Sequence, residues 1–187
     1  MTPPRRRCLR AALCALFLSA AAAAFAQQAA VPEPAGYRMG NYRAPVPATL
    51  EGATVVSTKE VEALAGEAIL IDVLPRPRRP EGLKKDAIWR PRPRSNIPGS
   101  VWLPNTGAGV LAISDEAYFR ENLKRLTGGD PNRKLLFYCL ADCWMSWNAA
   151  KRALAYGYRA VYWYPEGTDA WAAAGLPLEP SEPVPAE

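Results

Sequence analysis

One stretch decides the fold of this chain: KLLFYCLADCWMSWNAAKRALAYGY, residues 134–158. It begins with an apolar run typical of a buried strand, and this run ends in Cys139. A helical pattern that starts at Trp147 follows and stops at Gly157. The loop between them holds a second cysteine, Cys143. Most of what the sequence says about function depends on whether the two cysteines form a reactive pair, a metal site or two buried thiols.

Strand and helix patterns alternate along the rest of the chain. The expected strands are 53–57, 68–74, 101–104, 135–139 and 160–164. The expected helices follow a capping box at Ser57 and Glu60, a cap at Ser114, the loop after Cys139, and residue 167. This alternation indicates an α/β domain with a mainly parallel sheet. Sites in such sheets form beyond the carboxyl ends of the strands, where Cys139 lies.

Both ends of the chain differ from this pattern. Residues 1–26 have a basic start, an apolar run and an A-x-A ending at Ala24–Ala26, which predicts a secretory signal peptide and a periplasmic protein. A retained membrane anchor is the alternative, but after cleavage we expect no stable membrane insertion. Residues 27–50 are expected to be an extended leader, 51–178 the folded domain, and 179–187 a disordered tail.

Charge and composition exclude several classes of function. The chain has 23 basic and 18 acidic residues, and four of the arginines lie in the signal. The remaining 19 basic residues leave a net charge of +1, which gives no reason to expect nucleic acid as a partner. The sequence has no histidine. Two cysteines without histidine leave zinc short of ligands, so we expect no metal and no other cofactor.

A proline-rich excursion, residues 75–99, separates the second and third expected strands. It is too rich in proline for a helix. It concentrates eight basic residues: Arg76, Arg78, Arg79, Lys84, Lys85, Arg90, Arg92 and Arg94. One interpretation is a solvated excursion whose charges face water, and the other is a basic lid over an anion site at the end of the strand.

Four segments in this order resemble the rhodanese-like domain family. They are ILIDV at 69–73, NIPGSVWLP at 96–104, FYC with its loop and helix at 137–156, and GYRAVYWYPEGTDAWAAAGLPLE at 157–179. The resemblance implies a three-layer α/β domain with a mainly parallel central sheet flanked by helices. DCWMSWNAAKRAL and IPGSVWLP resemble more closely one exported group of this family, the Cys/Cys-Trp (CXXCW) motif proteins associated with PQQ-dependent catabolism. PQQ itself is not expected as a bound cofactor.

The resemblance places Cys139 at the family's catalytic cysteine, which carries a persulfide during sulfur transfer. The expected substrate-binding residues are Leu140, Ala141, Asp142, Trp144, Met145 and Ser146 in and after the loop, with Arg90, Arg92 and Arg94 from the excursion. Two features depart from the family. The loop is one residue longer than usual, as in the rhodanese-fold phosphatases, and it has no Arg or Lys.

The chemistry expected at Cys139 rests on its position between a strand and a helix. Backbone N–H groups of the loop and the helix N-terminus both favour the thiolate, which is the nucleophile. Cys143 would act as a resolving thiol, form a permanent structural bridge, or stay reduced and point away. Asp142 opposes the thiolate if it points inward and caps local N–H groups if it points outward. Trp144 is expected at the rim of the pocket.

Two functions follow from these residues. The first is a sulfurtransferase or thiol oxidoreductase with Cys139 as nucleophile and Cys143 as resolving thiol, acting on a small sulfur donor or thiol acceptor. The second is a non-catalytic module that docks onto a periplasmic quinoprotein or cytochrome of alcohol oxidation. Phosphatase activity is a distant third, because the loop lacks an arginine for phosphate.

Overall fold

A central sheet of five parallel strands organises residues 31–186, which are the residues that the computed structural model describes. The strand order is β1-β6-β5-β2-β4, and each neighbouring pair is parallel. The strands are β1 (Thr54–Val55), β2 (Ile69–Asp72), β4 (Val101–Trp102), β5 (Leu135–Tyr138) and β6 (Val161–Tyr164). The helices are α1 (Thr58–Leu64), α2 (Ile113–Thr127), α3 (Trp144–Ala155) and α4 (Gly167–Ala173).

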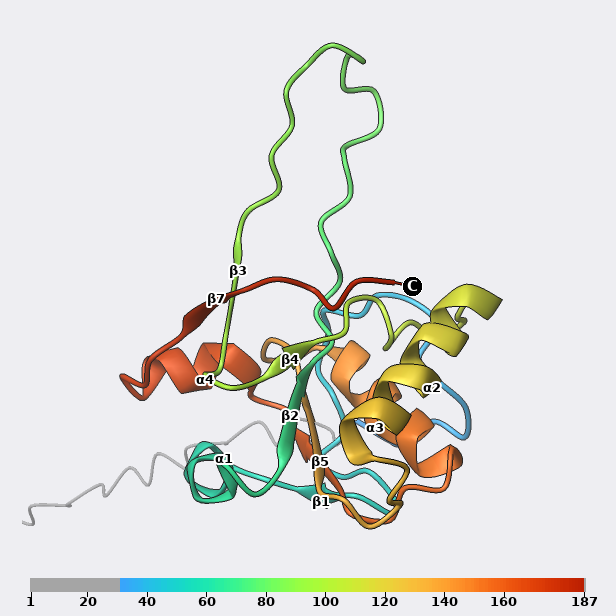
Figure 1. The fold of residues 1–187 in the computed structure, drawn as a ribbon, viewed down its shortest axis with the longest axis vertical. Coiled ribbons are helices and arrows are strands. Elements are labelled where there is room, and N and C mark those ends of the chain that lie inside the picture. Colours follow the sequence, from blue (N-terminus) through green and yellow to red (C-terminus); the bar gives the residue numbers. More distant parts are fainter. Residues whose placement is uncertain (1–30, 187) are drawn as a thin grey trace, which may run out of the picture.

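Alternate residues of the central strand β5 face two separate hydrophobic clusters. Leu135 and Phe137 pack into the cluster formed with α2 and α3. Leu136 and Tyr138 pack into the cluster that contains Val61 of α1 and a tryptophan of α4. Since side chains alternate across a strand, an apolar run such as LLFY buries both faces of the sheet. The result is the predicted three-layer α/β arrangement (Figure 1).

The helix boundaries follow local signals, with two differences from the sequence prediction. The backbone N–H of Ser57 donates to the Glu60 carboxylate at 2.8 Å, as expected for the capping box. Helix α2 begins at Ile113 with Ala112 as its N-cap, so the predicted cap at Ser114 is wrong. Helix α3 begins three residues before the predicted start, because the backbone N–H of Trp144 is already satisfied by a carbonyl of the leader.

The two segments that flank the domain are ordered against it. Residues 179–181 lie in the tail that the sequence predicts to be disordered, but they form β7 (Glu179–Ser181), antiparallel to β3 (Arg94–Asn96). Farther on, the Val184 N–H donates to the Trp102 carbonyl at 3.0 Å. The tail is ordered because exposed strand edges supply partners for its backbone, which composition does not reveal.

The leader has little regular structure over residues 31–50 but lies against α3. Leu50 is buried in the main cluster, and the Trp147 indole N–H donates to the Thr49 carbonyl at 3.1 Å. The predicted signal peptide lies outside the described residues. Within residues 31–186, no helix combines the length and the apolar character that crossing a membrane requires.

Candidate functional site

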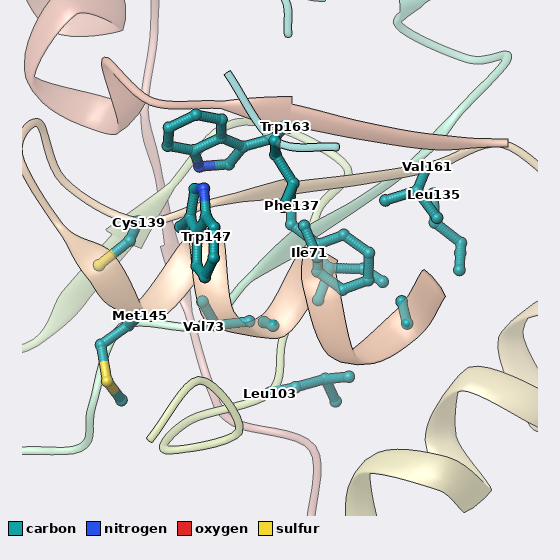
Figure 2. Close-up of a cluster of buried hydrophobic side chains, with 14 of the residues drawn as sticks. Ile71, Val73, Leu103, Leu135, Phe137, Cys139, Met145, Trp147, Val161 and Trp163 are labelled. Atoms are coloured by element: carbon teal, nitrogen blue, oxygen red, sulfur yellow. The ribbon is translucent and has the colours of Figure 1, made fainter. Parts of the chain in front are cut away.

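Cys139 directly follows β5 at the carboxyl edge of the sheet. Its side chain is 0% exposed and lies in the same cluster as Trp147 and Val73 (Figure 2). Its carbonyl accepts a hydrogen bond from the backbone N–H of Thr168 at 3.1 Å. Gly167 precedes that residue with φ +54°, and a Cβ there would collide with the Cys139 carbonyl. The first residue of α4 must therefore be glycine.

Cys143 is the N-cap of α3, and the structure pairs it with Cys139 in a disulfide. The two Cα atoms are 6.2 Å apart, within the range that disulfides span. Cys143 is also buried. Of the three states expected for Cys143, the structure therefore shows a bridged pair instead of a reduced thiol that points away. Both a reversible exchange and a permanent bridge fit this state.

The loop between the cysteines differs from the expected anion nest. The Ala141 N–H donates to the Asp169 carboxylate at 3.0 Å. The Trp144 N–H donates to the Tyr42 carbonyl at 2.9 Å. These two amides are thus directed to protein acceptors and not to the sulfur. Asp142 is exposed with φ +50°, so its side chain takes the outward of the two orientations considered from the sequence.

The leader covers this loop, an arrangement that no pattern in the sequence indicates. Arg43 forms an isolated antiparallel bridge with Cys143, and the Ala44 N–H donates to the Asp142 carbonyl at 3.1 Å. The Trp144 indole N–H donates to the Pro45 carbonyl at 3.1 Å. Trp144 is consequently 2% exposed, and the prediction that it forms the pocket rim is wrong.

The other predicted loop residues take packing positions or partly exposed ones. Leu140 and Ala141 are half-buried beside the cysteines. Met145 and Ser146 lie inside the first turn of α3 and are buried. The Ser146 hydroxyl donates to the Cys143 carbonyl at 3.0 Å and accepts the Trp163 indole N–H at 3.0 Å. Ser146 therefore holds the start of α3 in place and does not face a substrate.

The three arginines of the excursion separate into two groups. Arg90 and Arg92 are exposed on a long projection that points away from the sheet (Figure 1), so the structure does not place them over the site as a lid. Arg94 lies at the root of the projection, in β3. It donates from Nε and Nη2 to Asp72 Oδ2, each at 2.6 Å. Its two Nη atoms also lie 3.4 Å from the Thr168 hydroxyl.

Arg94 thus supplies, from outside the loop, a cation near the strand end that holds Cys139. Thr168 links the two, because its N–H contacts the Cys139 carbonyl and its hydroxyl contacts Arg94. Burial raises the pKa of Asp72 to about 6, while the Arg94 guanidinium lowers it. Sequence reasoning missed Thr168. Its place in the first turn of the helix that follows the last parallel strand is the signal that would have found it.

Two cavities lie elsewhere on the described part of the chain. One of about 860 Å³ separates α2 from residues 184–186, and one of about 260 Å³ lies near Tyr156 and Tyr158. Neither is lined by a cysteine. Because Cys139 is fully buried and Cys143 nearly so, a reagent that reaches Cys139 must displace part of the cover formed by the loop and the leader.

Comparison with known proteins finds one matching family and several solved structures that are similar to this chain. The model of the rhodanese-like domain matches residues 57–174. A thiosulfate sulfurtransferase from Pseudomonas aeruginosa aligns with 19% identity and a TM-score of 0.47, over 70% of this chain and 21% of that one. This chain therefore spans about a fifth of that protein. The comparison with curated proteins finds no match.

Two further solved structures have comparable similarity. The polysulfide-sulfur transferase homodimer from Wolinella succinogenes is 21% identical, with a TM-score of 0.41, over 68% of this chain and 78% of that one. An uncharacterised protein from Saccharomyces cerevisiae is 22% identical, with a TM-score of 0.41, over 66% of this chain and 93% of that one.

The ion pair of Asp72 and Arg94 predicts a pH-dependent effect of Arg94→Gln. Because the folded pKa of Asp72 is above its unfolded value, its contribution to stability is greatest below about pH 4 and is lost as the pH rises toward 6. Without Arg94 the pKa of Asp72 rises further, so this loss extends to higher pH. We expect Arg94→Gln to lower the free energy of unfolding by about 3 kcal/mol at pH 8 and by clearly less at pH 4.5.

Urea denaturation at the two pH values measures this difference. Arg92→Gln is the matched control, because Arg92 is exposed, and it should change the free energy of unfolding by less than about 0.5 kcal/mol at either pH. Adding Asp72→Asn to Arg94→Gln should remove the extra pH dependence. Equal losses at both pH values would show that the ion pair does not have this role.

Because the leader covers the loop, we predict that access to the thiols depends on Asn148 of α3, which binds the leader. The Asn148 amide accepts the Arg38 N–H and donates to the Arg38 carbonyl, both at 2.9 Å, so it holds the leader in place. In the reduced protein, Asn148→Ala should raise the rate at which iodoacetamide alkylates the cysteines by roughly tenfold, since local opening costs less free energy. Asn122→Ala, another largely buried asparagine in α2, is the control and should leave that rate near the wild-type value.

Proposed function

This chain belongs to the rhodanese-like domain family, and on this premise we propose that Cys139 carries out thiol and persulfide chemistry, as sulfur transfer or as dithiol–disulfide exchange. One observation supports this most: Cys139 directly follows the central parallel strand and is paired with a second cysteine in a disulfide. Cys143 also caps the N-terminus of the 12-residue helix α3, which favours negative charge at the Cys143 sulfur of the reduced form.

The proposed cycle starts from the dithiol, which an external thiol pair forms by reducing the disulfide and becoming oxidised itself. The Cys139 thiolate attacks the outer sulfur of a donor persulfide, R–S–SH. A sulfur–sulfur bond forms to Cys139, the donor's sulfur–sulfur bond breaks, and R–S⁻ leaves. The Cys143 thiolate then attacks Cys139 Sγ, which restores the disulfide and releases HS⁻. With an acceptor thiol in place of Cys143, the same persulfide delivers its sulfur to that acceptor.

Three residues near Cys139 have roles in this cycle. Arg94 places a guanidinium, paired with Asp72, at this edge of the sheet, whereas the loop itself lacks a cation. Thr168 fixes the Cys139 backbone, so the sulfur keeps its position when the disulfide opens. Asp142 faces outward and so does not place its negative charge beside the sulfur.

A non-catalytic binding module is the second candidate, and the complete burial of Cys139 favours it. In that case the disulfide is a permanent bridge that fixes the covered loop, and the surface around the leader docks onto a partner protein. A short disulfide loop adds little entropy-based stability, so a purely structural bridge gains less here than in a long loop. This consideration favours the exchange reaction.

The proposal also includes export to the periplasm and a protein partner there. The basic, apolar and A-x-A segments of residues 1–26 support export to the periplasm. There, a small sulfur donor or thiol acceptor would meet Cys139. The likeness of DCWMSWNAAKRAL to the CXXCW group supports a role beside PQQ-dependent alcohol oxidation, with a quinoprotein or cytochrome as the protein partner.

A single-turnover assay of sulfide release tests the cycle. The protein is reduced, freed of reductant and mixed with an organic persulfide. Wild type should release about one equivalent of sulfide as its disulfide re-forms, because Cys143 resolves the persulfide. Cys143→Ser should hold the sulfur and release at least about tenfold less. Sulfide release by Cys139→Ser at the wild-type level would exclude Cys139 as the nucleophile and leave the binding module.

A further inference from the structure

The excursion between β2 and β3 forms a projecting arm, residues 75–93 (Figure 1). Five of these residues are proline, at 75, 77, 80, 91 and 93. Proline has no backbone N–H to donate and restricts the chain to extended conformations. The two legs therefore offer few backbone donors for strand pairing, and a partner would have to recognise side chains.

The tip of the arm is a small ordered turn and not a loose end. The Arg79 guanidinium donates to the Ala87 carbonyl at 3.0 Å and to the Lys84 carbonyl. The Ala87 N–H donates to the Lys84 carbonyl at 2.9 Å. Ile88 follows this turn and is 85% exposed. The turn thus holds an exposed apolar side chain among basic ones.

The small net charge of the chain conceals a strong separation of charge. The arm has seven basic residues and two acidic ones, Glu81 and Asp86, a net charge of +5. The other described residues, 31–74 and 94–186, have twelve basic and fifteen acidic ones, a net charge of −3. The positive arm attracts anionic surfaces and repels cationic ones, whereas the negative body does the reverse. An anionic partner is therefore directed to the arm.

We propose that this arm is the docking element for an acidic surface of a partner protein. Five of its seven basic residues are arginine. Arginine is enriched and lysine depleted in protein–protein interfaces, because the planar guanidinium pairs with carboxylates through two hydrogen bonds. The prolines keep the legs extended before binding, which lowers the entropy lost on docking. This docking is independent of the thiol chemistry proposed for Cys139.

An anionic membrane is the competing kind of partner, and the distribution of charge argues against it. The basic residues follow both legs from Arg76 to Arg92, so an upright arm would bring only the tip to a flat membrane. An arm lying flat would bring the acidic body to the same negative surface. A partner protein, in contrast to a flat membrane, can contact both legs of the arm without approaching the acidic body.

The test measures binding of the full chain to two probes, poly-L-glutamate and vesicles of equal parts phosphatidylglycerol and phosphatidylcholine. The arm variant changes four exposed arginines to glutamine, Arg76, Arg78, Arg90 and Arg92. The control variant changes four exposed basic residues of the body to glutamine, Lys124, Arg125, Arg133 and Arg159, with the same change in net charge. Arg79 is kept because it holds the tip.

The arm variant should bind poly-L-glutamate at least about tenfold more weakly than wild type, and the control by less than about twofold. The arm variant should also show a smaller decrease of affinity with salt. Equal losses for both variants would overturn the proposal, since net charge alone would then decide binding. Tighter binding to the vesicles than to poly-L-glutamate, lost in Ile88→Ser, would overturn it in favour of a membrane. Failure of sulfide release at Cys139 would leave these results unaffected.

Discussion

The parallel pairing of β5 with β2 on one side and β6 on the other is the constraint on which the rest of the site depends. Asp72, Tyr138 and Tyr164 lie in register across the three strands, so the residues that follow them meet at one edge. Cys139 therefore comes next to the first turn of α4, and Asp72 faces the same edge. Apolar runs buried on both faces make this pairing stable, and the residues at the strand ends are then free to be polar.

At that edge, three segments that are distant in the sequence surround the pair of cysteines. The leader pairs with the loop, the first turn of α4 fixes the Cys139 carbonyl, and Arg94 from the root of the arm binds Asp72 and Thr168. The result is an oxidised and buried pair beside a buried cation. Buried polar groups of this kind are stable only while each keeps its partner. Reduction of the disulfide and release of the leader are therefore linked steps in the thiol chemistry proposed here.

Much of this could be predicted from the sequence, because periodicity and caps act locally. The alternation of strands and helices and the position of Cys139 both follow from neighbouring residues, whereas the direction of the Asp142 side chain stayed open. The predictions that were wrong concerned features that depend on contacts with distant segments. Trp144 is buried because the leader covers it, the tail is ordered because β3 has a free edge, and two loop amides are taken by Asp169 and Tyr42. Arg94 differs from Arg90 and Arg92 only because β3 brings it back to the sheet.

The most direct test of the central claim is the mass of the Cys143→Ser protein after reduction, removal of reductant and incubation with an organic persulfide. Without the resolving thiol, sulfur transferred to Cys139 has no second cysteine to displace it. The account predicts a gain of one sulfur atom in the intact protein, located by fragmentation on the peptide that contains Cys139 and absent in the Cys139→Ser protein. An unchanged mass, from protein whose Cys139 alkylates when it is unfolded, would contradict the account.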